Sequence, residues 1–127
     1  MQLQIKTQPI SPLVAGLSLV GNINDQTASA LNEEIDRLLA GPAKTLVLDM
    51  SHVEMVTSAG VGAIMNAQES ARAKGGDLAM NHLQPQVKRA FEIMSLVPTL
   101  NVFESERELD EYLTKVQERM IDDQEEE

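Results

Sequence analysis

The sequence of 127 residues contains no cysteine. A chain without thiols has no thiol catalysis, no thiolate zinc site and no disulfide framework, and this composition fits a cytosolic protein. No stretch approaches 18 consecutive apolar residues, and the N-terminus lacks the basic and apolar regions of a secretory signal. We therefore expect a cytoplasmic protein without membrane insertion.

Positive charge is also scarce. Ten Lys and Arg residues stand against 20 Asp and Glu residues, so the formal net charge is -10. Nucleic acids and anionic membrane surfaces repel such a chain, which argues against both as direct partners. The acidity is concentrated from Glu104 onward, and the last six residues, 122–127, contain five acids and no apolar group. They are predicted to form a solvated tail.

Length and hydrophobic content predict one globular domain. A chain of 127 residues with 43% hydrophobic residues can bury a core without help from a metal or a disulfide. Hydrophobic periodicity and turn residues predict the order β-β-α-β-α-β-α-β-α. The first expected strand begins at Leu3 and ends at a turn around Pro9–Pro12. The other expected strands cover residues 14–20, 45–50, 77–80 and 100–103. The expected helices cover residues 25–40, 61–74, 85–94 and 105–120.

This order predicts an α/β fold: a mixed sheet of about five strands with an antiparallel hairpin at the N-terminus and four helices. The apolar run at 45–50 is typical of a central strand that is buried on both faces. In such sheets the working site usually lies beyond the carboxyl ends of the strands. Two turns lie there, at residues 21–25 and 56–60.

The second turn places hydroxyl groups and small residues at the start of a helix. Thr57 and Ser58 are followed by Ala59, Gly60 and Gly62. One interpretation is structural, with Ser58 as the N-cap and both glycines used for packing. In the other, Ser58 accepts a phosphoryl group, because a phosphate at a helix N-terminus meets free N–H donors and the positive end of the dipole.

Other chemistry is weakly represented. Asp49, His52 and Ser58 suggest a hydrolase only by proximity, since no G-x-S-x-G elbow is present. His82 is interpreted as a loop residue, and two histidines without cysteine are a poor metal set. The seven methionines are interpreted as flexible core filling. We therefore predict no enzyme, no catalytic residue, no metal and no cofactor.

Several ordered motifs carry a family resemblance. The chain resembles the STAS domain (sulfate transporter and anti-sigma factor antagonist) over about residues 3–116. The motifs are GNINDQTASAL at 21–31, Asp49-Met50-Ser51, Val53, Val56, Thr57-Ser58-Ala59-Gly60-Val61-Gly62, Ala73-Lys74-Gly75-Gly76-Asp77-Leu78 and Val87-Lys88-Arg89-Ala90-Phe91. The resemblance implies a STAS domain at 1–116, followed at 117–127 by the end of the last helix and the acidic tail.

The resemblance also implies a partner and a switch. Free-standing bacterial members antagonise anti-sigma factors, and a serine in this turn is phosphorylated by an anti-sigma factor serine kinase; here that acceptor is Ser58. Thr57 stands where the antagonists typically have Asp, and is the alternative acceptor. Asn24, followed by Asp25, stands where the family has an acid. The implied partner-binding residues are Asn22, Asn24, Asp25, Thr57, Ser58, Ala59 and Gly60.

Two functions follow from the resemblance. The first is an anti-sigma factor antagonist, monomeric when free, whose binding to the kinase ends when Ser58 is phosphorylated. The alternative is a STAS subunit of a transporter complex or a signalling scaffold that is not phosphorylated. The first is the favoured interpretation, and the neutral Thr57 keeps the alternative open.

Overall fold

The computed structural model describes residues 3–93, 101–103 and 107–115. One five-stranded sheet is formed by β1 (Gln4–Ser11), β2 (Val14–Ile23), β3 (Thr45–Val56), β4 (Leu78–Asn81) and β5 (Asn101–Phe103). The strands lie in chain order, with β1 antiparallel to β2 and the other pairs parallel. The N-terminal hairpin and the central position of β3 are confirmed.

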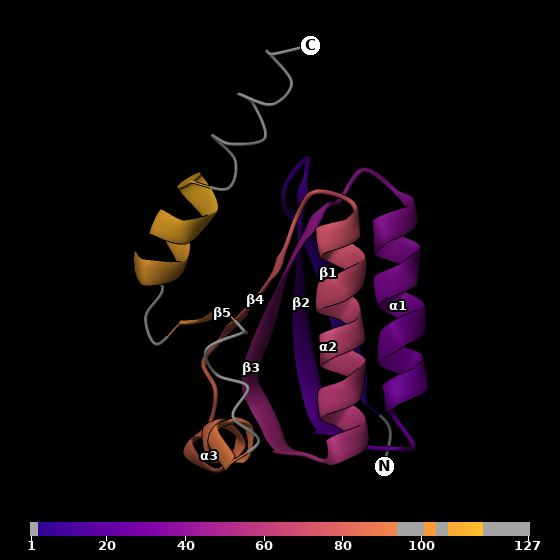
Figure 1. Cartoon of the computed structure of the whole chain (residues 1–127), viewed down its shortest axis with the longest axis vertical. Coiled ribbons are helices and arrows are strands. Elements are labelled where there is room, and N and C mark those ends of the chain that lie inside the picture. The colour runs from indigo at the N-terminus through magenta and orange to yellow at the C-terminus, as the bar shows by residue number, and fades with distance from the viewer. Residues whose placement is uncertain (1–2, 94–100, 104–106, 116–127) are drawn as a thin grey trace.

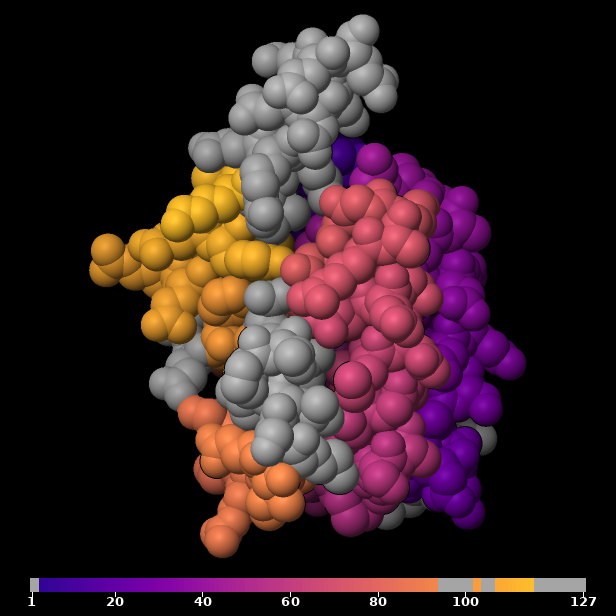
Figure 2. All heavy atoms as spheres, viewed as in Figure 1, coloured from indigo at the N-terminus to yellow at the C-terminus, as the bar shows by residue number. Residues whose placement is uncertain are grey.

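Helices lie on both faces of this sheet. They are α1 (Ala28–Ala40), α2 (Ser58–Ala73), α3 (Pro85–Ile93) and a C-terminal helix at residues 107–115. Figure 1 shows α1 and α2 side by side on one face, and Figure 2 shows that their side chains form one continuous surface. The predicted α/β order is therefore confirmed, and so is the helical start at Pro85.

Alternation along the strands divides the core in two. Ala15, Leu17 and Leu19 of β2 belong to the cluster that packs against α1, α2 and α3, together with Leu46, Leu48 and Met50 of β3. Residues at the alternate positions of the same strands face the opposite side of the sheet. Val14, Val47 and Ala79 pack against Leu109 and Leu113 of the C-terminal helix. The helix predicted over 105–120 is confirmed within 107–115, where these two leucines are buried.

β1 is longer than predicted. We expected a turn limited by proline, yet Pro9 lies within the strand opposite Ala15, and the register shifts between Pro9 and Ser11. Proline cannot donate to a ladder and is confined to edge strands and bulges. β1 is an edge strand, so the sheet accommodates Pro9.

The first helix begins later than predicted, at Ala28 rather than Asp25. Neither Asn24 nor Asp25 is its N-cap, because the Asn24 side chain instead accepts hydrogen bonds from the backbone N–H groups of Gln26 (2.9 Å) and Thr27 (3.1 Å). That geometry is an Asx turn. Thr27 occupies the N-cap position without a side-chain cap. Asn24 therefore shapes the turn and does not start the helix.

The methionine interpretation is wrong for two residues. Met50 and Met80 are fully buried in strands, as core filling requires. Met55 is 50% exposed at the end of β3, and Met65 is 40% exposed on α2. Exposed side chains of this kind contribute to a surface and not to the core.

Several predicted features lie outside the described residues. They are Met94 of the helix predicted over 85–94, Val97 and Pro98 before the strand predicted over 100–103, Leu100 of that strand, Ser105, Glu106, Val116 and Met120 of the helix predicted over 105–120, and the tail at 122–127. The predicted boundary between domain and tail at residue 116 stays a prediction for the same reason.

Lys74 ties α2 to the end of α1. Its Nζ donates to the carbonyl oxygens of Leu39, Gly41 (2.9 Å) and Ala43 (3.3 Å). Cations stabilise carbonyl groups at helix C-termini, and a hydrogen bond from a charged donor is stronger than a neutral one.

We expect Lys74→Met to lower the free energy of unfolding by about 1 to 3 kcal/mol, because the apolar stem is kept while three carbonyls lose their donor. Urea denaturation followed by circular dichroism measures this. The exposed Lys6 is the control, since Lys6→Met removes the same charge from β1. Equal losses in the two variants would show that net charge, and not these carbonyl contacts, matters.

Candidate functional site

The carboxyl ends of β2 and β3 form the candidate site. Both strands run further than predicted: β2 continues from Val20 to Ile23, and β3 continues from Met50 to Val56. In the parallel ladder Ile23 is the partner of Val56, and the Thr57 N–H donates to the Ile23 carbonyl at 3.0 Å. The two turns predicted from the sequence are therefore neighbours.

Gly60 allows the first turn of α2 to approach β2. A Cβ atom at Gly60 would lie 2.3 Å from the Ile23 carbonyl oxygen, closer than real Cβ contacts occur. The predicted packing role of Gly60 is thus confirmed. The same role is wrong for Gly62, since a Cβ there would meet nothing within 4 Å.

Thr57, not Ser58, caps α2. Thr57 is the N-cap residue with extended backbone, and its hydroxyl oxygen accepts from the Gly60 N–H at 3.4 Å. The structural interpretation of Ser58 as the cap is therefore wrong. Ser58 is the first residue of the helix, is exposed, and makes no side-chain hydrogen bond within the described part of the chain.

Backbone N–H groups without an acceptor lie in the first turn of α2, which also carries the Ser58 hydroxyl. The N–H groups at the start of a helix have no acceptor within that helix. The Thr57 hydroxyl oxygen accepts from the Gly60 N–H, whereas the backbone N–H groups of Ser58 and Ala59 have no acceptor among the described residues. The first turn of α2 contains no acidic residue. An anion attached at Ser58 would therefore meet two free donors and the positive end of the helix dipole.

The turn after β2 is held by Thr27, which the sequence analysis missed. Its hydroxyl donates to the Asn22 carbonyl at 2.8 Å and accepts from the Asn24 N–H at 2.9 Å. Thr27 is 4% exposed. Its position directly before the apolar periodicity of α1 was the available signal, since threonine favours helix starts. Thr27 thus positions residues 22–25 without facing solvent.

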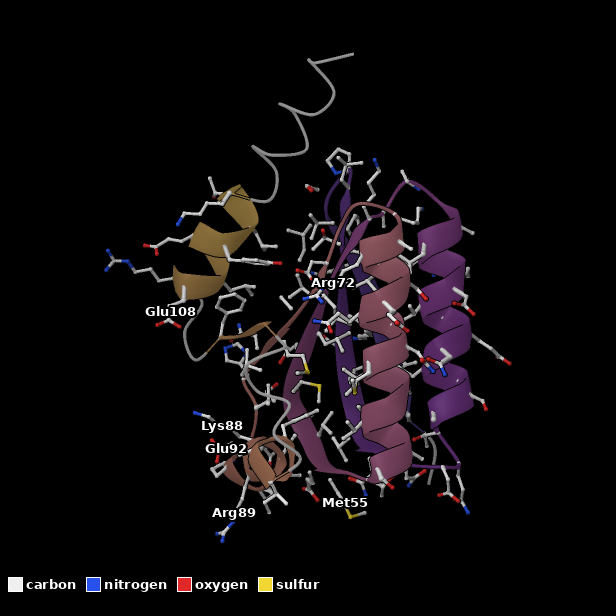
Figure 3. All side chains as sticks on the ribbon, in the orientation of Figure 1. Met55, Arg72, Lys88, Arg89, Glu92 and Glu108 are labelled. Atoms are coloured by element: carbon white, nitrogen blue, oxygen red, sulfur yellow. The ribbon has the colours of Figure 1, made fainter. Side chains whose placement is uncertain are left out.

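The predicted partner-binding residues differ in exposure. Asp25, Ser58 and Ala59 are exposed, Asn22, Asn24 and Thr57 are half-buried, and Gly60 is buried. Met55, not predicted, projects from the end of β3 beside the start of α2 (Figure 3). The site therefore offers polar atoms, one hydroxyl and one exposed apolar side chain at the same end of the molecule.

The residues of the hypothetical hydrolase are not brought together. Asp49 accepts from the Ser51 N–H at 3.0 Å and lies 3.4 Å from Nδ1 of His82. His52 instead contacts the Ser51 hydroxyl at 3.1 Å. Burial raises the pKa of Asp49, but hydrogen bonds from Ser51 and then His82 outweigh it and lower that pKa overall. In the described ranges no cluster of three or more His, Asp or Glu residues could hold a metal.

The family model for the STAS domain matches residues 6–109. The chain belongs to the STAS domain family. This STAS domain is 28% identical over 86 residues to BtrV of Bordetella bronchiseptica, named as a candidate anti-sigma factor antagonist; the match covers 65% of this chain and 74% of BtrV. All the STAS motifs predicted from the sequence lie within the matched range, whereas the predicted resemblance over 3–116 extends beyond that range at both ends.

Solved structures share the fold of this STAS domain. An anti-sigma factor antagonist from Mycobacterium paratuberculosis superposes with a TM-score of 0.75 at 25% identity, over 91% of this chain and 94% of that chain. The unphosphorylated form of the anti-sigma factor antagonist SpoIIAA gives a TM-score of 0.73 at 15% identity, over 87% and 97%. The names of all three relatives contain the term anti-sigma factor antagonist.

No helix in the described ranges of this STAS domain has the length and apolar character needed to span a membrane.

Proposed function

We propose that this STAS domain is an anti-sigma factor antagonist that binds an anti-sigma factor serine kinase and is released when Ser58 is phosphorylated. The observation that carries the proposal is the environment of Ser58: an exposed, unbonded hydroxyl on the first residue of α2, beside the turn after β2. Relatives with the same fold are named as antagonists of this class, and SpoIIAA has been solved in a phosphorylated form.

The binding surface in this proposal comprises both turns. Asn22, Asn24 and Asp25 supply the β2 side, and Thr57, Ser58 and Ala59 supply the α2 side, while Gly60 sets their separation. Met55 adds apolar contact area. The protein acts in the cytoplasm as a monomer when free, and it contacts neither nucleic acid nor membrane, in keeping with its net charge of -10.

Phosphorylation acts on this surface through charge. The Ser58 oxygen takes the γ-phosphoryl group of ATP, ADP leaves, and the hydroxyl proton passes to a base of the kinase. The product adds about 1.5 to 2 negative charges. The free N–H groups of Ser58 and Ala59 accommodate the phosphate within the domain. A partner pressed against the same turn would have to desolvate it, which weakens binding.

The test is mass spectrometry after incubation with ATP and the kinase recovered with the tagged protein from its own cells. We expect one phosphate, on Ser58, and none in Ser58→Ala. Phosphate on Thr57 instead would mean that the neutral residue has moved the acceptor by one position. Because the Thr57 hydroxyl accepts from the Gly60 N–H, Ser58 is the freer nucleophile.

Binding is tested separately. We expect Ser58→Asp to weaken kinase binding at least about tenfold, since one added charge is desolvated in the interface. Ser58→Ala keeps binding, and Ser70→Asp is the control, because it adds the same charge at an exposed position near the opposite end of α2. If neither Ser58 nor Thr57 is modified and Ser58→Asp binds every native partner like the wild type, the unphosphorylated STAS subunit takes the place of the switch.

A further inference from the structure

The sheet face that carries the C-terminal helix contains a cavity of about 250 Å³. Its floor and walls come from four neighbouring strands, and Leu109 and Asp110 of the C-terminal helix complete it. Gly16 lies in the floor. Because a Cβ there would meet the Ile10 side chain at 3.1 Å, the absence of a side chain at Gly16 leaves the space open.

Two carboxylates give the cavity its charge. Asp49 lies on β3 and Asp110 on the C-terminal helix, and no lysine or arginine lines the cavity within the described part of the chain. Lys6 lies on the same face of β1, two residues before Gln8, but is not part of the lining. Asp110 makes no side-chain ion pair or hydrogen bond within the described ranges, and the pKa of Asp49 is lowered. Oδ1 of Asp49 already lies 3.4 Å from Nδ1 of His82, which also lines the cavity. The second oxygen of Asp49 and both oxygens of Asp110 can accept from a cation.

A buried hydrogen-bond donor opens into the same space. Asn81 is 4% exposed, and its Oδ1 accepts from the His82 N–H at 2.9 Å, which fixes the orientation of its amide. Its Nδ2 has no acceptor among the described residues, although every fully buried side-chain nitrogen and oxygen described has a partner. Nδ2 is therefore open to the cavity that Asn81 lines. This amide can donate a hydrogen bond to an acceptor on a ligand in the cavity.

The remaining lining is mixed, since Gln8, Ser18 and His82 are polar. Ile10, Val47 and Leu109 provide walls for an aliphatic chain. The volume is below the range of about 300 to 1,000 Å³ that is typical for drug-sized ligands. The occupant must then be small, cationic at one end, aliphatic in the middle, and able to accept a hydrogen bond from Asn81.

We propose that this cavity binds a basic amino-acid residue such as arginine, with its guanidinium on Asp49 and Asp110 and its carbonyl oxygen on Asn81 Nδ2. The stem lies against the apolar walls, as long cationic side chains do on apolar surfaces. Free arginine and an arginine residue of a polypeptide offer this same chemistry. The site lies on the opposite sheet face from α1 and α2 and does not depend on the role of Ser58.

The probes are N-acetyl-arginine methylamide, free L-arginine and agmatine, titrated into the ¹⁵N-labelled full chain by NMR. We expect the first to shift the Asn81 side-chain NH₂ pair and the amides of Gly16 and Ser18. Agmatine has the guanidinium but no carbonyl, so we expect it to bind several-fold more weakly. Saturable binding of free arginine alone would identify a free amino acid as the ligand, and binding of the acetylated probe alone would identify a polypeptide.

Variants that remove one carboxylate each distinguish binding in the cavity from a general attraction of the cationic probe to an acidic protein. We expect Asp49→Asn to weaken binding about tenfold and the exposed Asp110→Asn about threefold. Asp36→Asn removes the same charge from the exposed face of α1 and should leave the affinity unchanged. Because Asp110 is exposed, its variant keeps the fold and decides the test even if Asp49→Asn unfolds. Absence of shifts at Asn81, or equal weakening by Asp36→Asn, overturns the proposal.

Discussion

Gly60→Ala is expected to lower the free energy of unfolding by at least about 3 kcal/mol, although it adds a single methyl group. The new Cβ would lie 2.3 Å from the Ile23 oxygen and 2.8 Å from its carbonyl carbon. Both are backbone atoms within a parallel ladder, so no side-chain rotation relieves the contact. Either the start of α2 or the end of β2 must move, and the hydrogen bond from Thr57 to Ile23 is lost.

Gly62→Ala is the matched control, two residues further along the same helix. A Cβ at Gly62 meets nothing within 4 Å, so the variant should gain up to about 1 kcal/mol from helix propensity. Urea denaturation of both variants measures the free energy of unfolding, which should fall in Gly60→Ala and rise in Gly62→Ala. Equal stability of the two would show that α2 does not start against β2. If Gly60→Ala still folds, we expect this variant to bind the kinase more weakly as well, because Ser58 is displaced.

Leu113→Ala is expected to cost about 2 to 5 kcal/mol. Leu113 is 6% exposed and packs with Val14, Val47 and Ala79 on the sheet face opposite α1 and α2. Truncation leaves a cavity beneath the helix, in which Leu109 is the other buried residue within 107–115 and Tyr112 is partly buried.

The neighbouring Lys115→Ala is the control, because that side chain is exposed on the same helix. Thermal and urea unfolding of the full chain distinguish the variants. Should Leu113→Ala melt like Lys115→Ala, the packing of residues 107–115 on the sheet would contribute nothing to stability, and the cavity roofed by Leu109 would lose its support.

Local patterns were sufficient to predict the elements but not their ends. Apolar periodicity identified α1, α2 and the C-terminal helix, and Pro85 and Gly75–Gly76 marked a start and a stop correctly. The extensions of β2 and β3 were missed because alternation fails at Gly21–Asn22 and Ser51–His52. What keeps these residues extended is the parallel pairing of Gly21 with Val53 and of Ile23 with Val56. Pairing across 32 or 33 positions leaves no local signal.

The site was predictable in the same partial way. The turns at 21–25 and 56–60 were found because both follow apolar strands of a parallel sheet. Which hydroxyl caps α2 and which is free could not be inferred, since Thr57 and Ser58 are both good caps and only the backbone angles choose between them. The contact of Asp49 with His82 joins β3 to the residue that follows β4, so proximity in sequence suggested His52 instead.

The unequal lengths of β3 and β4 have a mechanical consequence. β4 pairs with β3 only at residues 46–49, whereas β2 accompanies β3 as far as Val56. Beyond Asp49 the two strands form an arm whose other edge is held by the Gln84 side chain, which donates to the Ser51 carbonyl at 2.9 Å. Ser58 stands at the tip of this arm. A partner that displaced this end of β3 would therefore also strain the hydrogen bond of Gln84, the residue directly before α3.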